Sequence, residues 1–249
     1  MIRGLYSAAS ALLANVRRLE VVTNNLANAE TVGFKQDRTG AAAFSDLLVF
    51  ELDNRRWAPE VGQLTLSTVA QPPELDLTQG ALRATGRALD VALEGPGFLA
   101  VQTPQGERYT RDGSLTRNAD GLLTTSTGEL VLGAGGPIRL PDGPIELAED
   151  GTFLLDGEPV ARLRLVELPA DAGFNRDGRN LLAPRDGAAP RPATLTTVRQ
   201  GYVEASNVDL TGAMTAALAL QRSYVANQRL LQQQDEVLAR AVSDIARPT

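Results

Sequence analysis

The most regular feature of the chain is a series of leucines near its start, spaced seven residues apart. The series is Leu5, Leu12, Leu19 and Leu26, with Ala9, Val16 and Thr23 between them at alternating four- and three-residue steps. This a/d pattern keeps one face of a helix turned toward a partner helix. Residues 4 to 28 contain no proline and no internal glycine, so we predict one helix of about 25 residues, roughly 37 Å long.

The C-terminal part of the chain repeats the same spacing and offers the partner. The positions are Leu210, Met214, Ala217, Gln221, Tyr224, Gln228, Leu231, Asp235, Leu238, Val242 and Ile245. We predict a second helix of about 35 residues, roughly 50 Å long, with Ser206 or Asn207 as its N-cap. The two terminal helices are expected to pair as a coiled coil.

Two interpretations of these helix faces stay open. The a/d positions can form the core of a helix pair within one chain, the seam of a larger assembly, or both. Apolar residues off this face widen the apolar stripe and favour contacts with further helices; they are Leu13, Val22, Leu218 and Val225. The polar seam positions Gln221, Gln228 and Asp235 either set the register or face solvent.

The middle of the chain changes to a β pattern. From Gly80 to about Leu168, short alternating segments such as 89–93 are separated by turn dipeptides, and Asp-Gly recurs at 112–113, 120–121, 142–143, 150–151 and 156–157. Asp-Gly favours tight hairpin turns. We predict many antiparallel strands, with the segments 89–93 and 98–101 forming a hairpin around Gly95-Pro96-Gly97.

These patterns predict an α+β protein with an all-β, hairpin-rich domain inserted between two helical ends. The predicted parts are a discontinuous helical domain of residues 1–40 and 206–249, an extended connector of residues 41–80 and 190–205, and a β-rich domain of residues 81–189. Prolines and glycines break up residues 169–193, and we expect a surface loop or lid there.

Composition removes most enzyme classes. The chain has no cysteine and no histidine, which excludes thiol nucleophiles, histidine bases and the commonest zinc ligands. None of the Asp-Gly turns has the D-x-D-x-D-G ladder of a calcium loop, and no carboxylate pair stands out from solvated surface. We therefore expect no catalytic residues, no metal, no cofactor and no small-molecule substrate.

Charge and hydropathy point to protein partners. The net charge is −6, with no block of like charges, so neither nucleic-acid binding nor a polybasic membrane anchor is expected. No stretch approaches the ~20 apolar residues that span a bilayer. Two features are typical of a secretory signal, because Arg3 precedes an apolar run and residues 27–29 resemble a cleavage site. The charged and polar residues between that run and the site argue against it.

Three segments of the chain resemble the axial proteins of the bacterial flagellum, specifically the basal-body rod proteins of the FlgF/FlgG type. The first is the Asn24-Asn25-Leu26-Ala27-Asn28 segment that leads to Gly33-Phe34-Lys35. The second runs from Leu89 through Gly97-Phe98 to Tyr109-Thr110-Arg111. The third is residues 200–208, which include Gly201, Ser206 and Asn207. The three occur in the family's order and span nearly the whole chain.

The resemblance implies a structural subunit of the flagellar basal-body rod that polymerises helically and transmits torque from motor to hook. It implies partners among the other rod proteins and copies of the chain itself, and export by the flagellar type III apparatus to a rod in the cell envelope. Phe44 and Leu48 resemble a short export motif. The short segment 49–62 favours the FlgF type over FlgG.

One alternative of another class stays open. A secreted β-rich adhesin or carbohydrate-binding protein with a helical stalk would also combine a β middle with acidic charge. Glycan sites usually use exposed aromatic side chains, and the chain is only 4% aromatic with one tryptophan. We therefore rank the rod subunit first.

Overall fold

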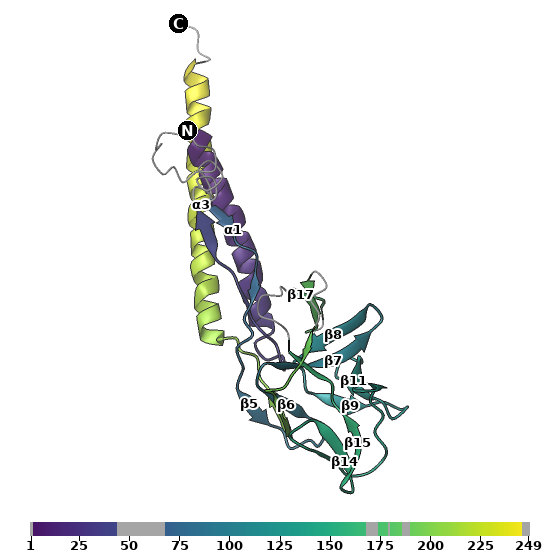
Figure 1. Ribbon diagram of the computed structural model, residues 1–249. Coiled ribbons are helices and arrows are strands. Elements are labelled where there is room, and N and C mark those ends of the chain that lie inside the picture. The colour runs from purple at the N-terminus through teal and green to yellow at the C-terminus, as the bar shows by residue number, and fades with distance from the viewer. Residues whose placement is uncertain (1, 44–67, 168–173, 179, 186–189, 246–249) are drawn as a thin grey trace, which may run out of the picture. The chain divides into compact units, whose positions relative to one another are not determined.

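The computed structural model describes residues 2–43, 68–167, 174–178, 180–185 and 190–245 (Figure 1). The chain divides into two compact units, and each is described by itself. Unit one consists of residues 1–27, 37–74 and 209–249, and unit two of residues 28–36 and 75–208.

Unit one is built on two long helices that pack side by side (Figure 1). These are α1 (Ile2–Ala27) and α3 (Leu210–Ile245), and the Asn15 side-chain amide donates to the Ser223 hydroxyl between them at 3.0 Å. Strand β1 (Asp37–Arg38) follows α1, and an antiparallel pair, β2 (Ala41–Ala43) with β3 (Thr68–Ala70), is placed so that β3 contacts α1. Neither helix in the described part of the chain is long and apolar enough to cross a membrane.

The N-cap of α3 differs from the prediction. The Asp209 carboxylate accepts a hydrogen bond from the Thr211 amide at 3.1 Å, and the Asp209 carbonyl accepts from Ala213. That is the geometry of an N-cap. The prediction of Ser206 or Asn207 is therefore wrong, because the chain reaches helical geometry only after Val208.

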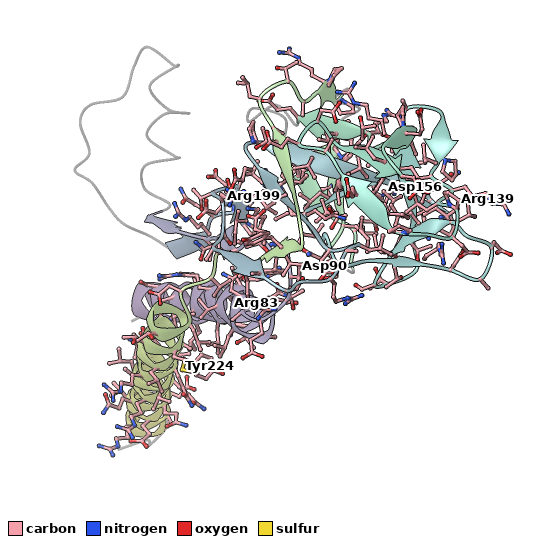
Figure 2. The ribbon with its side chains drawn as sticks, turned by 90° about the horizontal axis from the view of Figure 1, so that it is seen from below. Arg83, Asp90, Arg139, Asp156, Arg199 and Tyr224 are labelled. Atoms are coloured by element: carbon pink, nitrogen blue, oxygen red, sulfur yellow. The ribbon has the colours of Figure 1, made fainter. Side chains whose placement is uncertain are left out.

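At every second predicted position of α3, the less exposed residue is the one just before the predicted residue. Leu220 is only 7% exposed, while Gln221 and Gln228 face solvent, Met214 is 49% exposed, and Tyr224, labelled in Figure 2, is 37% exposed. The half-buried and buried positions are Ala213, Ala216, Ala217, Leu220, Asn227, Leu231 and Gln234. Burying the apolar Leu220 turns its polar neighbour Gln221 toward solvent, so the stripe of α3 that is covered within unit one runs through Leu220 and not through Met214.

In α1, the predicted positions lie mostly at intermediate exposure. Ala14 is buried, Ala9, Leu12, Leu19 and Leu26 are half-buried, and Val16 is exposed at the margin of the stripe. The side chains of Leu5, Leu238 and Val242 lie outside the described residues, as does the predicted export motif at Phe44 and Leu48.

Unit two is the predicted β-rich part, and its described strand pairs are antiparallel. Its strands are β5 (Leu82–Ala84), β6 (Val91–Glu94), β7 (Gly97–Thr103), β8 (Gly106–Thr110), β9 (Leu115–Arg117), β10 (Leu123–Thr125), β11 (Leu130–Gly133), β12 (Gly136–Pro137), β13 (Ile145–Leu147), β14 (Thr152–Leu155), β15 (Glu158–Arg162), β16 (Leu165–Glu167), β17 (Phe174–Arg176), β18 (Leu182–Pro184), β19 (Arg191–Pro192), β20 (Thr197–Gln200) and β21 (Tyr202–Glu204). Strand β4 (Glu74–Leu75) spans the boundary between the units.

Strand β7 organises the core of unit two. It pairs with β8, β11 and β16 within a ten-stranded sheet. Leu99 and Val101 join one buried apolar cluster, while Phe98 and Ala100 join another. Because side chains alternate across a strand, β7 is covered on both faces, which explains its nearly continuous apolar run.

Two predicted features of the β part are corrected. Strand β6 pairs with β20, not with β7, so the predicted hairpin around Gly95 to Gly97 is wrong; its actual partner lies too far along the chain for local periodicity to reveal. The predicted loop at residues 169–193 contains β17 and β18, which extend the large sheet through β8. Between the two strands, the Asp177 amide donates to the Leu181 carbonyl and the Leu181 amide donates to the Gly178 carbonyl.

Candidate functional site

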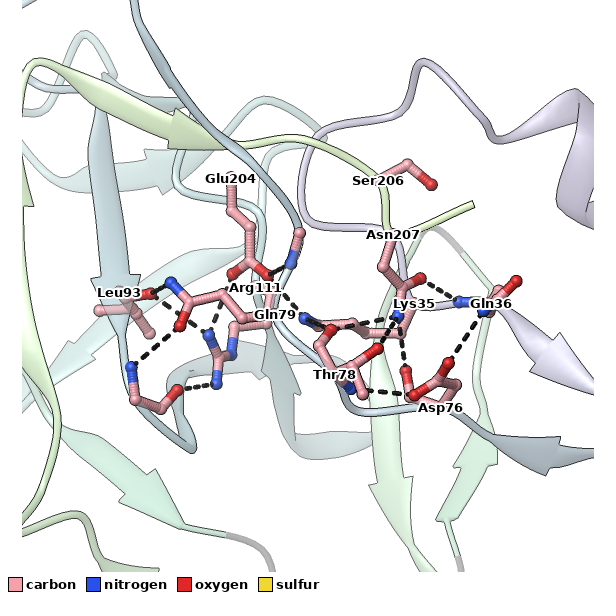
Figure 3. A network of polar contacts seen from close by, with 12 residues as sticks. Lys35, Gln36, Asp76, Thr78, Gln79, Leu93, Arg111, Glu204, Ser206 and Asn207 are labelled. Atoms are coloured by element: carbon pink, nitrogen blue, oxygen red, sulfur yellow. Dashed lines mark hydrogen bonds and ion pairs between the residues drawn. The ribbon is translucent and has the colours of Figure 1, made fainter. Parts of the chain in front are cut away.

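The three signature segments converge on a buried carboxylate in unit two. Glu204, which ends β21 and is 1% exposed, accepts hydrogen bonds from Lys35 Nζ at 2.6 Å, Arg111 Nη1 at 3.0 Å and the Gly80 amide at 2.8 Å (Figure 3). Lys35, Arg111 and Glu204 belong to the first, second and third segments respectively. We call these three residues the ion cluster.

The two cations of the ion cluster are held by carbonyl oxygens as well as by Glu204. Lys35 Nζ donates to the Thr78 carbonyl at 2.7 Å, and Arg111 donates to the carbonyls of Leu93 and Gly95. The Arg111 guanidinium also lies 4.8 Å from the centre of the Phe98 ring. Burial lowers the pKa of Lys35 from its ordinary 10.5, and the hydrogen bond and charge of Glu204 oppose this.

Burial likewise lowers the pKa of Arg111, again against the attraction of Glu204. Desolvating three charges costs several kcal/mol per ion, and hydrogen bonds and mutual attraction must offset that cost. Such a cluster therefore adds little net stability but selects one arrangement of the three segments. Any other packing of these segments would leave a buried charge unpaired.

Asn207 extends the network next to the ion cluster. Its side-chain oxygen accepts from the Gln36 amide at 2.7 Å, and its side-chain nitrogen donates to the carbonyls of Asp76 at 2.9 Å and Thr78 at 3.1 Å (Figure 3). The Asp76 carboxylate accepts from the Gln36 side chain and the Thr78 amide. The predicted signature residue Asn207 thus joins residues 36, 76 and 78 through backbone groups.

Gly33 is where the first segment comes closest to the second. Its φ is +67°, and a Cβ there would lie 2.3 Å from the Arg111 carbonyl carbon and oxygen. Its amide donates to the Glu204 carbonyl at 2.7 Å. A side chain at this position would force the backbones apart, so the glycine is required both for its conformation and for the close approach.

The hairpin of β17 and β18 holds the same segment from its other side. The Arg176 guanidinium lies 4.3 Å from the centre of the buried Phe34 ring and donates to the Lys35 carbonyl. Asn180 donates from its side chain to the Val32 carbonyl at 2.8 Å. Residues 32–35 are thereby bound to the β-rich remainder of unit two by backbone as well as side-chain contacts.

Other predicted signature residues have separate places. Gly201, with φ +77°, lies between β20 and β21 and lets the chain change partner from β6 to β5. The Ser206 hydroxyl accepts from the Val208 amide. Asn28 accepts from Thr31 through both its side chain and its carbonyl.

Asn25 has a defined role in unit one. Its side-chain nitrogen donates to the Asp37 carbonyl at 2.8 Å, and its oxygen accepts from the Asp37 amide at 3.0 Å. The buried side-chain amide of Asn25 thus forms the two hydrogen bonds that a neighbouring strand would form with residue 37, and it links residue 37 to the C-terminal end of α1. Asn24 and Ala27 are exposed, and Leu26 is half-buried; these residues belong to unit one, whereas the ion cluster belongs to unit two.

Sequence reasoning missed Lys35, Arg111, Glu204, Arg176 and Asn180 as site residues. The first three stood inside the quoted segments. For Glu204 and Arg111, a charged residue within an apolar strand pattern was a usable signal, because Glu204 follows Tyr202-Val203 and Arg111 follows Tyr109-Thr110. Nothing in the local pattern marks Arg176 or Asn180, which lie in the range predicted as a loop. Among the described residues, no group of three acids could hold a metal ion.

Comparison with known proteins assigns the same three segments to flagellar proteins. Residues 5–35 match a family model described as "Flagella basal body rod protein", residues 92–155 match "Flagellar hook protein FlgE/F/G D1 domain", and residues 199–244 match "Flagellar basal body rod FlgEFG protein C-terminal". Lys35, Arg111 and Glu204 each fall in a different one of these matches.

Full-length relatives agree with the family models. The chain is 33% identical to the flagellar basal-body rod protein FlgF of Caulobacter vibrioides, over 99% of both chains. It is 34% identical to FlgF of Escherichia coli, over 97% of both. It is 29% identical to the rod protein FlgG of Bacillus subtilis, over 98% of this chain and 99% of the relative.

Proposed function

The chain belongs to the family of flagellar basal-body rod proteins, and from this premise we propose that it is a FlgF-type rod subunit that transmits torque between motor and hook. Members of this family are structural proteins rather than enzymes. The chain is accordingly a structural component of the flagellar basal body that assembles with other rod and hook proteins.

The FlgF assignment is supported by the identities above. The two FlgF relatives named above are 33% and 34% identical, against 29% and 30% for two FlgG relatives. The short segment 49–62 points the same way.

Assembly through the terminal helices is the core of the proposal. The observation that carries it is the set of large apolar side chains that α1 and α3 leave exposed after packing on each other, among them Leu13 at 69% and Leu218 at 56%. Burying one such side chain contributes about 1.5–3 kcal/mol. A row of them on helices already paired within the subunit is a surface for neighbouring subunits, and contacts that do not close on themselves build a helical rod.

We assign the seam positions to two kinds of contact. The half-buried positions Ala9, Leu12, Leu19, Leu26 and Leu231 hold α1 and α3 together as a coiled coil within the subunit. Met214, Tyr224 and Val16, which are exposed, belong with Leu13 and Leu218 to the surface that meets other subunits. Leu5, Leu238 and Val242 complete the seam toward the helix ends.

The ion cluster gives the proposed mechanical role a physical basis. It fastens residues 33–35, which lie shortly after α1 in the sequence, to strands that precede α3. A subunit under torque must not let these segments slip, and a buried charge that would lose its partners opposes slippage. We further propose export through the flagellar type III apparatus, with Phe44 and Leu48 in its recognition, and a place in the periplasmic part of the rod.

Point substitutions on the exposed helix faces test the assembly surface. The variants L13E and L218E are expressed in cells that lack their own copy of the chain, with L13M and L218M as controls that keep an apolar side chain at the same positions. Loss of swimming and of the chain from purified basal bodies is expected for the glutamate variants only. Normal motility with both glutamate variants would refute the assembly surface.

A further inference from the structure

The described chain contains six Asp-Gly steps, and they differ in how firmly the structure holds their reactive atoms. The steps are at 112–113, 120–121, 142–143, 150–151, 156–157 and 177–178. In an Asp-Gly step, the glycine amide nitrogen can attack the aspartate Cγ, because the missing side chain removes steric hindrance. We propose that Asp156-Gly157 is a site of spontaneous backbone modification, at which the folded protein accumulates isoaspartate.

The chemistry needs no other reactant than water. The Gly157 nitrogen bonds to the Asp156 Cγ, and the hydroxyl group of the protonated carboxyl leaves with the amide proton as water, which closes a five-membered succinimide. Water then adds to the ring. Addition at the Asp156 carbonyl carbon leaves the chain connected through Cγ as isoaspartate, while addition at Cγ restores aspartate.

Asp156-Gly157 has both reactive groups free. It forms the two-residue turn between β14 and β15, where Leu155 lies opposite Glu158, and Asp156 is exposed (labelled in Figure 2). Within the described structure, neither the Asp156 carboxylate nor the Gly157 amide has a hydrogen-bond or ion-pair partner. A Cβ at Gly157 would meet nothing within 4 Å, so the ring has room to form.

The backbone at this turn also stores strain. Asp156 has φ +51°, a left-handed conformation that costs a residue with a side chain about 1 kcal/mol or more. Gly157 follows at φ +84°. Because isoaspartate adds a methylene to the backbone, the product is no longer bound to this conformation.

At three of the other steps, the aspartate carboxylate has a hydrogen-bond or ion-pair partner. Asp112 accepts from the Ser114 amide and the Ser126 hydroxyl, each at 2.9 Å. Asp142 forms an ion pair with Arg117, and Asp177 forms one with Arg108. Each partner must be released before the carboxyl group can meet the glycine nitrogen.

At the remaining two steps, the glycine amide donates a hydrogen bond. The Gly121 amide donates to the Asn118 carbonyl at 3.0 Å, and the Gly151 amide donates to the Ala148 carbonyl at 2.9 Å. Asp150 is held at its carboxylate as well, by the Thr152 hydroxyl and amide, whose hydrogen bonds lower its pKa. An anionic carboxylate has no hydroxyl to release as water, which slows this step further.

The consequence for the fold is local. The added methylene lengthens a two-residue turn in which both residues have positive φ, the type I′ geometry that sets the hairpin register. The β14 and β15 pair lies at one end of a three-stranded sheet, so the change loosens an edge strand and leaves β7 in place.

Peptide mapping of the aged full chain tests the proposal. The protein is incubated folded and, in parallel, in urea, and isoaspartate at each step is measured by chromatographic separation of peptides of equal mass and by methyl transfer with an isoaspartate methyltransferase. We expect one hydrogen bond to a reactive group to slow isoaspartate formation at that step about fivefold, which corresponds to about 1 kcal/mol. Isoaspartate at Asp156 should therefore exceed that at each of the other five described steps by about fivefold in the folded chain, and this difference should vanish in urea.

Two variants make the test specific. D156E should abolish the leading signal, because glutamate would have to close a larger ring. R117A frees the Asp142 carboxylate and should raise isoaspartate at Asp142 alone. The proposal is overturned if one of the other five described steps matches Asp156 in the folded chain, if Asp156 stays unmodified while the urea sample reacts, or if R117A leaves Asp142 unchanged.

Discussion

Removal of the Glu204 carboxylate is the most informative perturbation of the fold. Glu204 accepts from two buried cations and one amide, at 2.6, 3.0 and 2.8 Å. E204A would leave Lys35 and Arg111 buried without their shared counter-ion. Breaking a buried ion pair from one side costs about 3–5 kcal/mol, which we expect as the loss in free energy of unfolding of unit two.

The matched control is an exposed ion pair in the same unit. Glu94 and Arg199 form a pair at 3.1 Å with both side chains well exposed, and such pairs contribute about 0–1 kcal/mol. E94A is therefore expected to cost little. E204Q, which keeps the shape and one acceptor oxygen, should fall between E94A and E204A.

The third variant separates the cost of an unpaired charge from the net value of the cluster. Replacing all three members together, as K35M/R111M/E204L, removes every charge and should cost less than E204A alone, because no ion is left stranded. Urea unfolding of the full chain, monitored by far-ultraviolet circular dichroism at wavelengths where β-strands contribute, gives the midpoint and slope for each variant. The reasoning is refuted if E204A lies within about 1 kcal/mol of E94A, or if the triple variant is the most damaged.

Two further predictions follow from single residues. G33A should destabilise unit two by at least about 2 kcal/mol, since it adds a Cβ 2.3 Å from the Arg111 carbonyl at a φ of +67°; a loss below about 0.5 kcal/mol in urea unfolding would contradict the close approach. Burial and the hydrogen bond to Glu107 raise the pKa of Tyr109 from 10.0 to about 12. The stabilisation that follows from this raised pKa is complete below pH 10.0 and is lost as pH rises through about 12. The prediction is contradicted if a titration followed by tyrosinate absorbance shows the same ionisation above pH 11 with and without the Y109F substitution.

The parts predictable from sequence were those that local periodicity encodes. The 4-3 spacing of seam positions revealed both helices, and Asp-Gly turns with alternating residues revealed the β middle. The pairing of β6 with β20 and the ion cluster were not predictable in this way, because Lys35 and Glu204 are separated by 169 positions. Periodicity also did not single out the stripe of α3 through Leu220, since a 4-3 spacing runs equally well through Met214, and only packing decides between the two.

The central claim is that this chain enters the rod through its terminal helices. The most direct test is electron microscopy of hook–basal bodies purified from cells that carry a labelled copy of the chain in place of their own, beside a copy that lacks residues 2–28. The account predicts label on the rod for the full chain, and no label and no swimming for the truncated chain. Label outside the rod, or a truncated chain that still enters the rod and supports swimming, would contradict it.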